Sequence, residues 1–320
     1  IAMTMSLTIV LSIAFFAGTS RPVRCKGGDP GRIRERPADV WRTVPCLNAS
    51  ALPAATSTST ANATSQETIM KLTGNTIFIT GGGSGIGRGL AEALHKRGNK
   101  VIISGRRRGH LDEVVAANPG MAAIELDITD PASIEKVAAQ LIADYPDLNV
   151  LINNAGIMLP DQAAGHIDDA LLVSTITTNL MGPIRMTSAL IDHLKTRNDA
   201  VVAYTSSVLA FVPLAMTAVY SSTKAALHSY ILSQRFMLRN TKVKVLEIAP
   251  PWVRTDLMNS REAEQAMPLE PFIDETIAVL GTDVDEVLVE GAKQFRGNPG
   301  PGEHAFVNGL NAQLVEVFGG

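Results

Sequence analysis

The feature that most constrains the fold is a glycine-rich turn between a buried apolar run and a helical pattern. Residues 75–80 (NTIFIT) read as a strand, and Thr80-Gly81-Gly82-Gly83-Ser84-Gly85-Ile86-Gly87 follows directly, opening a helix that should end near Arg97. Glycine permits a tight turn and a close approach of the backbone to a pyrophosphate, whose charge then lies against free helix N–H groups. With its TGxxxGxG spacing, this segment predicts a dinucleotide-binding site.

From Met70 onward, short apolar runs alternate with helical patterns. This alternation is typical of a parallel sheet covered by helices on both faces. We therefore predict an α/β fold, a doubly wound parallel sheet of the Rossmann type. The further strands are expected at residues 100–104, 122–126, 149–152, 200–205 and 242–248, with helices near 109–117, from 131, near 168–197 and near 218–239.

The composition changes near residue 69. Residues 21–66 are rich in Arg, Pro, Ala, Ser and Thr, and the low-complexity stretch 50–65 lacks the apolar surface needed to offset its ordering entropy. Residues 7–18 form a signal-like apolar run, but no Lys or Arg precedes it and no clear cleavage site follows. We expect 1–69 to be a disordered or spurious extension, and 70–320 to be a single cytoplasmic catalytic domain. If 1–69 is genuine, secretion or organelle import is the alternative.

Charge and cysteine content exclude several classes of function. A net charge of −3 and an aromatic content of 5% argue against a nucleic-acid partner. Both cysteines, Cys25 and Cys46, precede residue 70, which excludes thiol nucleophiles and cysteine metal sites from the main body. The six histidines form no HExxH pair or other tight ligand cluster in the sequence. We expect no metal, no nucleic acid and no membrane partner.

The end of the second strand indicates which dinucleotide is bound. An acidic residue is typical of NAD-binding sites about 20 residues beyond the glycine motif. Here Gly105 takes that place, followed by Arg106, Arg107 and Arg108. A guanidinium binds a 2′-phosphate bidentately, so we predict NADP(H), with Arg106 as the leading contact. The alternative is that these arginines solvate a helix start and that the enzyme uses NAD(H).

Tyr220 and Lys224 are the candidate catalytic pair. At i and i+4 they share one face of a helix, and a nearby cation favours the phenolate of a tyrosine whose ordinary pKa is about 10. Tyr220 would exchange a proton with an alcohol or carbonyl oxygen while hydride moves to or from nicotinamide. Such pairs are also common on solvated helix faces. Ser207 strengthens the interpretation because it lies just beyond the fifth strand, at the edge where doubly wound sheets bind ligands.

Several motifs in this order resemble the short-chain dehydrogenase/reductase family over about residues 70–260. They are the glycine-rich turn, Asn153-Asn-Ala-Gly156, Asn179, Ser206-Ser207, Tyr220-x-x-x-Lys224 and Pro250–Thr255. The Pro250-Pro251 pair and the tail NPGPGEHAFVN also resemble the bacterial oxidoreductase subgroup named after D-alanine esterification of teichoic acids. That name describes a genetic neighbourhood and implies no reaction.

The resemblance implies roles for individual residues. Tyr220 would be the acid/base, Ser207 would bind the substrate oxygen, and Lys224 would hold the nicotinamide ribose and lower the Tyr220 pKa. Asn179 would hold a water that relays protons from Lys224. Asn153 would lie nearest the adenosine ribose, and Asp127 would accept from the adenine amino group unless it is a helix N-cap. The expected cofactor contacts are Gly81, Ser84, Gly85, Ile86, Gly87, Arg106, Asp127, Ile128, Asn153, Ala155, Gly156, Tyr220, Lys224, Pro250, Val253 and Thr255.

The sequence departs from the family pattern at two places. Pro251 replaces the usual glycine and has a fixed φ and no N–H, which makes backbone contacts to nicotinamide less certain than the side-chain set. Residues 302–318 read as a helix where a final strand is usual. We therefore expect six strands, a seventh being doubtful.

The segments expected to rim the substrate pocket, 158–166, 209–218 and 252–272, are apolar. They favour a medium-sized apolar ketone, aldehyde or alcohol over a phosphorylated sugar. Arg254 could meet an acidic substrate, although an exposed loop arginine is commoner, and His228 is expected to serve packing or an interface. The long helices are apolar on more than one side, which indicates a homodimer or homotetramer.

We predict an NADP(H)-dependent oxidoreductase that interconverts a carbonyl and a secondary alcohol. One alternative is a non-catalytic NADP-binding regulator, which would have no need of the Asn179–Ser207–Tyr220–Lys224 set. Another is an NAD-dependent alcohol dehydrogenase of the same family. An epimerase or dehydratase of the extended branch is disfavoured by the turn spacing and the chain length.

Overall fold

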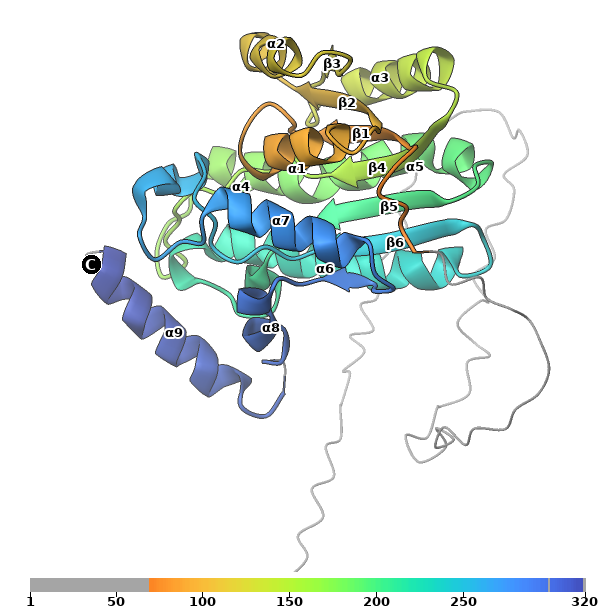
Figure 1. Cartoon of the computed structure of the whole chain (residues 1–320). Helices are drawn as coiled ribbons and strands as arrows, with labels where there is room; N and C mark the ends of the chain where they lie inside the picture. Colours follow the sequence, from red (N-terminus) through yellow and green to blue (C-terminus); the bar gives the residue numbers. More distant parts are fainter. Residues whose placement is uncertain (1–68, 299, 319–320) are drawn as a thin grey trace, which may run out of the picture. The chain divides into compact units, whose positions relative to one another are not determined.

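The computed structural model describes residues 69–298 and 300–318 (Figure 1). The expectations for residues 1–68 therefore lie outside the described part of the chain. Within that part, no helix is both long enough and apolar enough to cross a membrane.

Seven parallel strands form one sheet in the order β3-β2-β1-β4-β5-β6-β7. The chain passes from β1 out to β3 in one direction and from β4 out to β7 in the other, which confirms the doubly wound Rossmann-type sheet. The strands are β1 Thr76–Thr80, β2 Lys100–Gly105, β3 Ala122–Glu125, β4 Leu148–Asn153, β5 Ala200–Thr205, β6 Val243–Ile248 and β7 Glu286–Val287.

The expectation of six strands was wrong, because β7 completes the sheet. It has two residues, pairs with the end of β6, and is held by bonds from Glu247 N–H to the Asp285 carbonyl and from Ala249 N–H to the Val287 carbonyl. Two residues are too few to show a period in sequence. The tail is helical as expected, from Glu303 to Phe318, and the seventh strand lies upstream of it.

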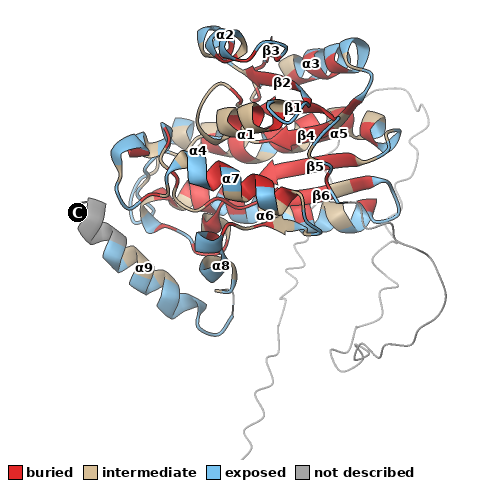
Figure 2. Ribbon diagram, in the orientation of Figure 1, coloured by how far each residue is buried: buried red, intermediate tan, exposed pale blue. Residues whose placement is uncertain are grey.

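Helices cover both faces of the sheet, and the strands between them are almost wholly buried (Figure 2). On one face α1, α2 and α7 pack on side chains such as Ile79, Ile103 and Ile152. On the other face α3, α5 and α6 pack on Phe78, Leu151 and their neighbours. The helices are α1 Gly85–His95, α2 Arg108–Ala117, α3 Pro131–Asp144, α4 Asp169–Ile176, α5 Gly182–Lys195, α6 Ala218–Leu238, α7 Leu269–Leu280, α8 Glu290–Arg296 and α9 Glu303–Phe318.

The long helix expected near 168–197 is divided by a π-helical segment, η2 (Thr177–Met181), between α4 and α5. The Gly182 N–H bonds the Thr177 carbonyl five residues back, and Pro183 follows without an N–H of its own. A Cβ on Gly182 would lie 2.9 Å from the carbonyl oxygen of Ile128, so glycine is needed for the close packing there. The segment carries Asn179 into the protein interior.

Candidate active site

The glycine-rich turn is fastened to the end of β4. The Thr80 hydroxyl accepts hydrogen bonds from the backbone N–H groups of Asn154 (3.0 Å) and Ala155 (3.1 Å). Gly81 has a φ of 70°, and a Cβ there would lie 2.9 Å from Ala155 Cα. The turn therefore packs against the β4 exit at a distance that only glycine allows.

The turn delivers the N-terminus of α1 to a cavity of about 1280 Å³ at the carboxyl ends of the strands. Ser84 takes the cap position with extended backbone, and its side chain makes no capping bond to α1. The first N–H groups of a helix have no partner within it and attract anions. Gly87 leaves no room for a side chain, since a Cβ would lie 2.3 Å from the Gly81 carbonyl oxygen. Gly81, Ser84, Gly85 and Ile86 line the cavity, whereas Gly87 packs behind it.

The three consecutive arginines have different surroundings. Arg106 and Arg107 line the cavity beside the turn, and Arg107 donates to the Ser84 hydroxyl at 3.4 Å. Arg108 instead forms an exposed ion pair with Asp112 one turn along α2, at 2.8 Å. Arg106 and Arg107 thus line the cavity, and Arg108 solvates the start of a helix.

Beyond β3, the side chain of Asp127 folds back on its own loop. One carboxylate oxygen accepts from the Thr129 N–H (2.9 Å) and hydroxyl (2.7 Å), and these bonds lower the Asp127 pKa. It is not the helix N-cap, because Asp130 caps α3. Ile128 and Thr129 line the cavity, but Asp127 is not among the lining residues.

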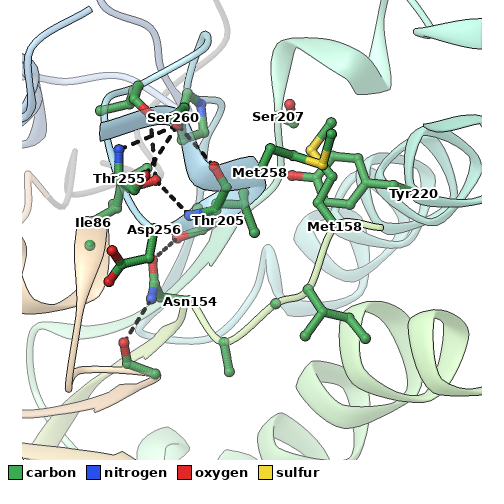
Figure 3. Close-up of a pocket in the computed structure, with 18 of the residues that line it drawn as sticks. Ile86, Asn154, Met158, Thr205, Ser207, Tyr220, Thr255, Asp256, Met258 and Ser260 are labelled. Atoms are coloured by element: carbon green, nitrogen blue, oxygen red, sulfur yellow. Dashed lines mark hydrogen bonds between the residues drawn. The ribbon is translucent and has the colours of Figure 1, made fainter. Parts of the chain in front are cut away.

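At the end of β4, the structure brings Asn154 rather than Asn153 to the cavity. Asn153 is buried and donates to the Thr187 hydroxyl on α5 at 2.9 Å, on the face of the sheet that α5 covers. The Asn154 amide donates to the carbonyl of Thr80 at 3.2 Å and accepts from the Thr205 hydroxyl at 3.4 Å (Figure 3). The sequence analysis put Asn153 of this motif nearest the ribose, although alternation along a strand could have shown that its neighbour Asn154 faces the other side. Ala155 and Gly156 also line the cavity.

Ser207, Tyr220 and Lys224 line the same cavity as the glycine-rich turn. Ser207 follows β5 and its hydroxyl accepts from the Leu209 N–H at 3.1 Å, while Tyr220 and Lys224 stand one turn apart on α6. The Lys224 Nζ donates to the Thr205 carbonyl at 2.8 Å and lies 5.4 Å from the centre of the Tyr220 ring. In Figure 3 the Tyr220 side chain points towards Met158 and Met258.

Burial dominates the electrostatics of this pair. Burial raises the pKa of Tyr220 to about 12, although a hydrogen bond with Ser207 acts to lower it. It also lowers the pKa of Lys224 to about 8, and the negative charge of Glu247 opposes that fall. The net Tyr220 pKa therefore lies above its ordinary value, and Tyr220 is a neutral phenol at pH 7.

Asn179, in the π-helical segment, holds the loop that follows β4. Its side-chain oxygen accepts from the Ile157 N–H and its amide donates to the Ile157 carbonyl, both at 2.8 Å. It does not line the cavity directly. Gly156 lies between it and the lysine, since a Cβ on Gly156 would be 3.3 Å from the Asn179 oxygen and 3.7 Å from Lys224 Nζ.

The loop after β6 lines the cavity beside the turn, since a Cβ on Gly85 would lie 3.4 Å from the Thr255 side chain. Pro250, Val253 and Thr255 line it, and Val253 forms a single parallel bridge with Met267. The Ser260 hydroxyl donates to the Val253 carbonyl at 3.1 Å (Figure 3). The loop continues into a 3-10 segment, η5 (Leu257–Glu262), in which Met258 has a φ of 55°.

The substrate half of the cavity is apolar. Arg254 is not among the residues that line this half, and its guanidinium donates hydrogen bonds to the carbonyls of Ala263, Glu264 and Ala266. Sequence reasoning missed the contributions of α8 and α9, among them the apolar Phe295 and Leu310, because a lining residue so far along the chain carries no local signal. The apolar lining residues predicted from the rim segments are Met158, Leu159, Leu209, Leu214, Met216, Trp252, Met258 and Met267. Phe211, Val212 and Leu269 instead pack in buried clusters.

A parallel sheet with a glycine cradle at its switch point, between β1 and β4, defines the class of dinucleotide-binding Rossmann proteins. The family model described as short chain dehydrogenase matches residues 75–266, and the chain belongs to that family. The resemblance found in the motifs is thereby confirmed.

Individual relatives agree with this assignment. An uncharacterized oxidoreductase, DltE of Bacillus subtilis (strain 168), is 39% identical over 199 residues, covering 62% of this chain and 79% of the relative. An NADP-dependent 3-hydroxy acid dehydrogenase of Schizosaccharomyces pombe is 29% identical over 255 residues, covering 74% and 98%. A short chain dehydrogenase from Burkholderia cenocepacia J2315, solved in complex with NADP, superposes with a TM-score of 0.66 at 27% identity, covering 77% and 99%.

Proposed function

We propose that the protein is an NADP(H)-dependent oxidoreductase that interconverts a carbonyl and a secondary alcohol, or reduces an aldehyde. The observation that carries this proposal is the placement of Ser207, Tyr220 and Lys224 in one cavity with the glycine cradle. The names of the yeast relative and of the Burkholderia structure, which both mention NADP, support the choice of cofactor.

The residues present fit a dinucleotide. The free N–H groups at the start of α1 would hold the pyrophosphate, and positions such as Gly81 leave the backbone bare where a Cβ would collide. Arg106 and Arg107 would hold a 2′-phosphate, since both line the cavity beside Ser84. When bound, the nicotinamide supplies or accepts the hydride.

Tyr220 would act as the proton donor during reduction. With its pKa raised to about 12, it holds its proton at neutral pH and can give it to a carbonyl oxygen as negative charge develops there. Ser207 would donate a second hydrogen bond to the same oxygen. Lys224, mostly protonated at pH 7 because its pKa is about 8, would hold the nicotinamide ribose and stabilise the phenolate that forms. Asn179 would hold the loop beside Lys224 and assist the exchange of protons with solvent.

The substrate we propose is a medium-sized apolar ketone or aldehyde. Methionine and leucine side chains dominate the lining beyond Tyr220, and Arg254 is engaged by three backbone carbonyls. A carboxylate substrate would therefore find no free arginine at that position, and a carbonyl flanked by apolar groups suits the lining better.

The proposal is tested by fluorescence titration with NADPH and NADH, followed by turnover assays with apolar carbonyls. We expect selective binding of NADPH. Tyr220→Phe removes the transferable proton while preserving the ring, so turnover should fall at least 1,000-fold with the NADPH Kd changed less than about two-fold. Turnover retained by Tyr220→Phe would refute the acid/base role. NADPH binding without turnover of any carbonyl would instead favour the regulator.

Self-association is a further part of the proposal. On α6, Leu232, Phe236 and Met237 are exposed by 44%, 62% and 73%. Such a surface favours a homodimer or homotetramer built through the long helices, which light scattering of the purified protein would check. The cytoplasmic location expected from the sequence stays a prediction, which fractionation of the native cells would test.

A further inference from the structure

A carboxylate lies buried in the sheet next to the catalytic helix. Glu247 on β6 is fully buried, between Tyr204 of β5 and Glu286 of β7 in the strand register. One of its carboxylate oxygens is 2.7 Å from the His228 Nδ1, and the other has no hydrogen-bond partner among the described residues. A carboxylate so far from solvent requires nearby positive charge.

Helix α6 presents two basic side chains to this region, one turn apart. His228 meets Glu247 directly, and because a carboxylate can only accept, His228 Nδ1 carries the proton of that bond. Lys224 lies one turn earlier, and its Nζ bonds the Thr205 carbonyl. Thr205 pairs with Ile248, the residue after Glu247, so lysine and histidine approach the same end of β6.

The other charges of the cluster are paired with one another. Arg296 on α8 grips Glu286 with two bonds, of 2.6 Å and 3.0 Å. Its guanidinium lies 4.9 Å from the centre of the Phe211 ring, which in turn packs edge-on against His228. Arg235 on α6 pairs with Asp285 at 3.5 Å. Glu286 thus has a close counter-ion in Arg296. Ligand atoms of Glu286, Glu247 and His228 lie within 4.8 Å of one another, so Arg296 and His228 act on both carboxylates, and Lys224 is the further cation on which the Glu247 charge acts.

We propose that Glu247, held in place by His228, is a positioning residue that keeps the Lys224 ammonium charged beside Tyr220. The inference rests on the proposed function, because its consequence for catalysis passes through the Tyr220–Lys224 pair. Glu247 does not line the cavity, so it acts through the lysine and not on the substrate.

The physical basis is an opposition of two effects on Lys224. Burial lowers the lysine pKa, and the Glu247 charge raises it, leaving it at about 8. Without the carboxylate, burial acts alone and the ammonium loses its proton at a lower pH. A neutral Lys224 no longer stabilises the Tyr220 phenolate, so alcohol oxidation would require a higher pH.

The first test is the pH profile of kcat for alcohol oxidation in the full chain. In Glu247→Gln, a Lys224 pKa lower by about one reduces the charged fraction at pH 7.5 from about three quarters to about one quarter. We therefore expect kcat at pH 7.5 to fall about three-fold, with little change at pH 6. The Kd for NADPH at pH 6, where Lys224 is charged, should change less than about two-fold. Glu247→Asp should restore much of the profile, and Glu270→Gln, a control that removes an exposed carboxylate on α7, should not shift it. A Glu247→Gln profile that superimposes on the wild type would overturn the proposal.

The second test needs no activity and separates this inference from the proposed function. Glu247→Gln should raise the equilibrium constant of unfolding at pH 6.5. The rise should be at least five-fold larger in the wild type than in a Lys224→Met background, where no ammonium remains to be stabilised. Equal effects in both backgrounds would overturn the coupling. Coupling without turnover of any carbonyl would leave the coupling standing and reject the oxidoreductase. If Glu247→Gln does not fold, Glu247→Met, which also removes the charge and needs no hydrogen-bond partner, replaces it in both tests, with the same direction expected.

Discussion

Lys224→Met should stabilise the fold while abolishing activity. The lysine is buried, and burial lowers its pKa from 10.5 to about 8. A fall of about 2.5 in pKa corresponds to about 3 kcal/mol that folding loses by keeping the ammonium away from water. Methionine has similar length, is flexible and requires no hydration. It loses the bond to the Thr205 carbonyl, worth about 1 kcal/mol, so the expected net gain is about 2 kcal/mol.

The pH dependence of this stability gain follows from the direction in which folding shifts the Lys224 pKa. Because the folded pKa lies below the unfolded one, the destabilisation is complete below about pH 8 and disappears as pH rises towards 10.5. The gain of Lys224→Met should therefore be about 2 kcal/mol at pH 6.5 and about 0.5 kcal/mol at pH 9.5. Urea denaturation at the two pH values measures it.

A matched control is Lys136→Met, on the exposed side of α3, which should change the free energy of unfolding by less than about 0.5 kcal/mol at both pH values. The reasoning fails if Lys224→Met is no more stable than the wild type at pH 6.5. It also fails if the gain is the same at pH 9.5, because a packing effect has no reason to titrate.

Three further substitutions test other parts of the structure. Gly87→Ala places a Cβ 2.3 Å from the Gly81 carbonyl oxygen. It should weaken NADPH binding more than ten-fold, measured by fluorescence titration, and lower the free energy of unfolding by about 1–3 kcal/mol. Unchanged binding would contradict the close packing. Asn99 is buried and its amide donates to the carbonyls of Leu72 and Leu94, so Asn99→Ala should cost about 2–3 kcal/mol in urea unfolding without changing the NADPH Kd. The Asn311 side chain on α9 donates to the Pro213 carbonyl. Asn311→Ala removes this bond and should raise KM for an apolar carbonyl about three-fold or more, with the NADPH Kd unchanged. An unchanged KM would show that α9 has no part in substrate binding.

Sequence reasoning succeeded where the determinants are local. The turn from Thr80 to Gly87 is recognisable because each glycine answers a steric demand within a few residues, as the 2.3 Å clearance at Gly87 shows. Tyr220 and Lys224 were placed on one helix face by their spacing alone, and the structure has them one turn apart on α6. Of the six strands after β1, sequence reasoning expected five. Each of the five begins and ends within two residues of its expected bounds.

It failed where the determinant is distant or too short to have a period. The two residues of β7 are a strand only because β6 offers them a partner. The π-helical turn at Asn179 ends at Gly182, which packs closely on Ile128, a residue far back along the chain. His228 was interpreted as a packing residue, since nothing in its own segment points to Glu247, 19 residues later on another element.

The two electrostatic predictions constrain each other. If Glu247 fully compensated the burial of Lys224, the lysine pKa would stay at its ordinary value and Lys224→Met would bring no stability. The pKa near 8 indicates partial compensation, enough to keep the ammonium charged at neutral pH but not enough to remove its cost. If an apolar residue of the same size proves more stable at this position, packing does not explain the lysine, and its charge does. Measured together, a large gain for Lys224→Met and a strong coupling to Glu247 would therefore identify the ammonium itself as the group that the cluster of α6, β6, β7 and α8 supports.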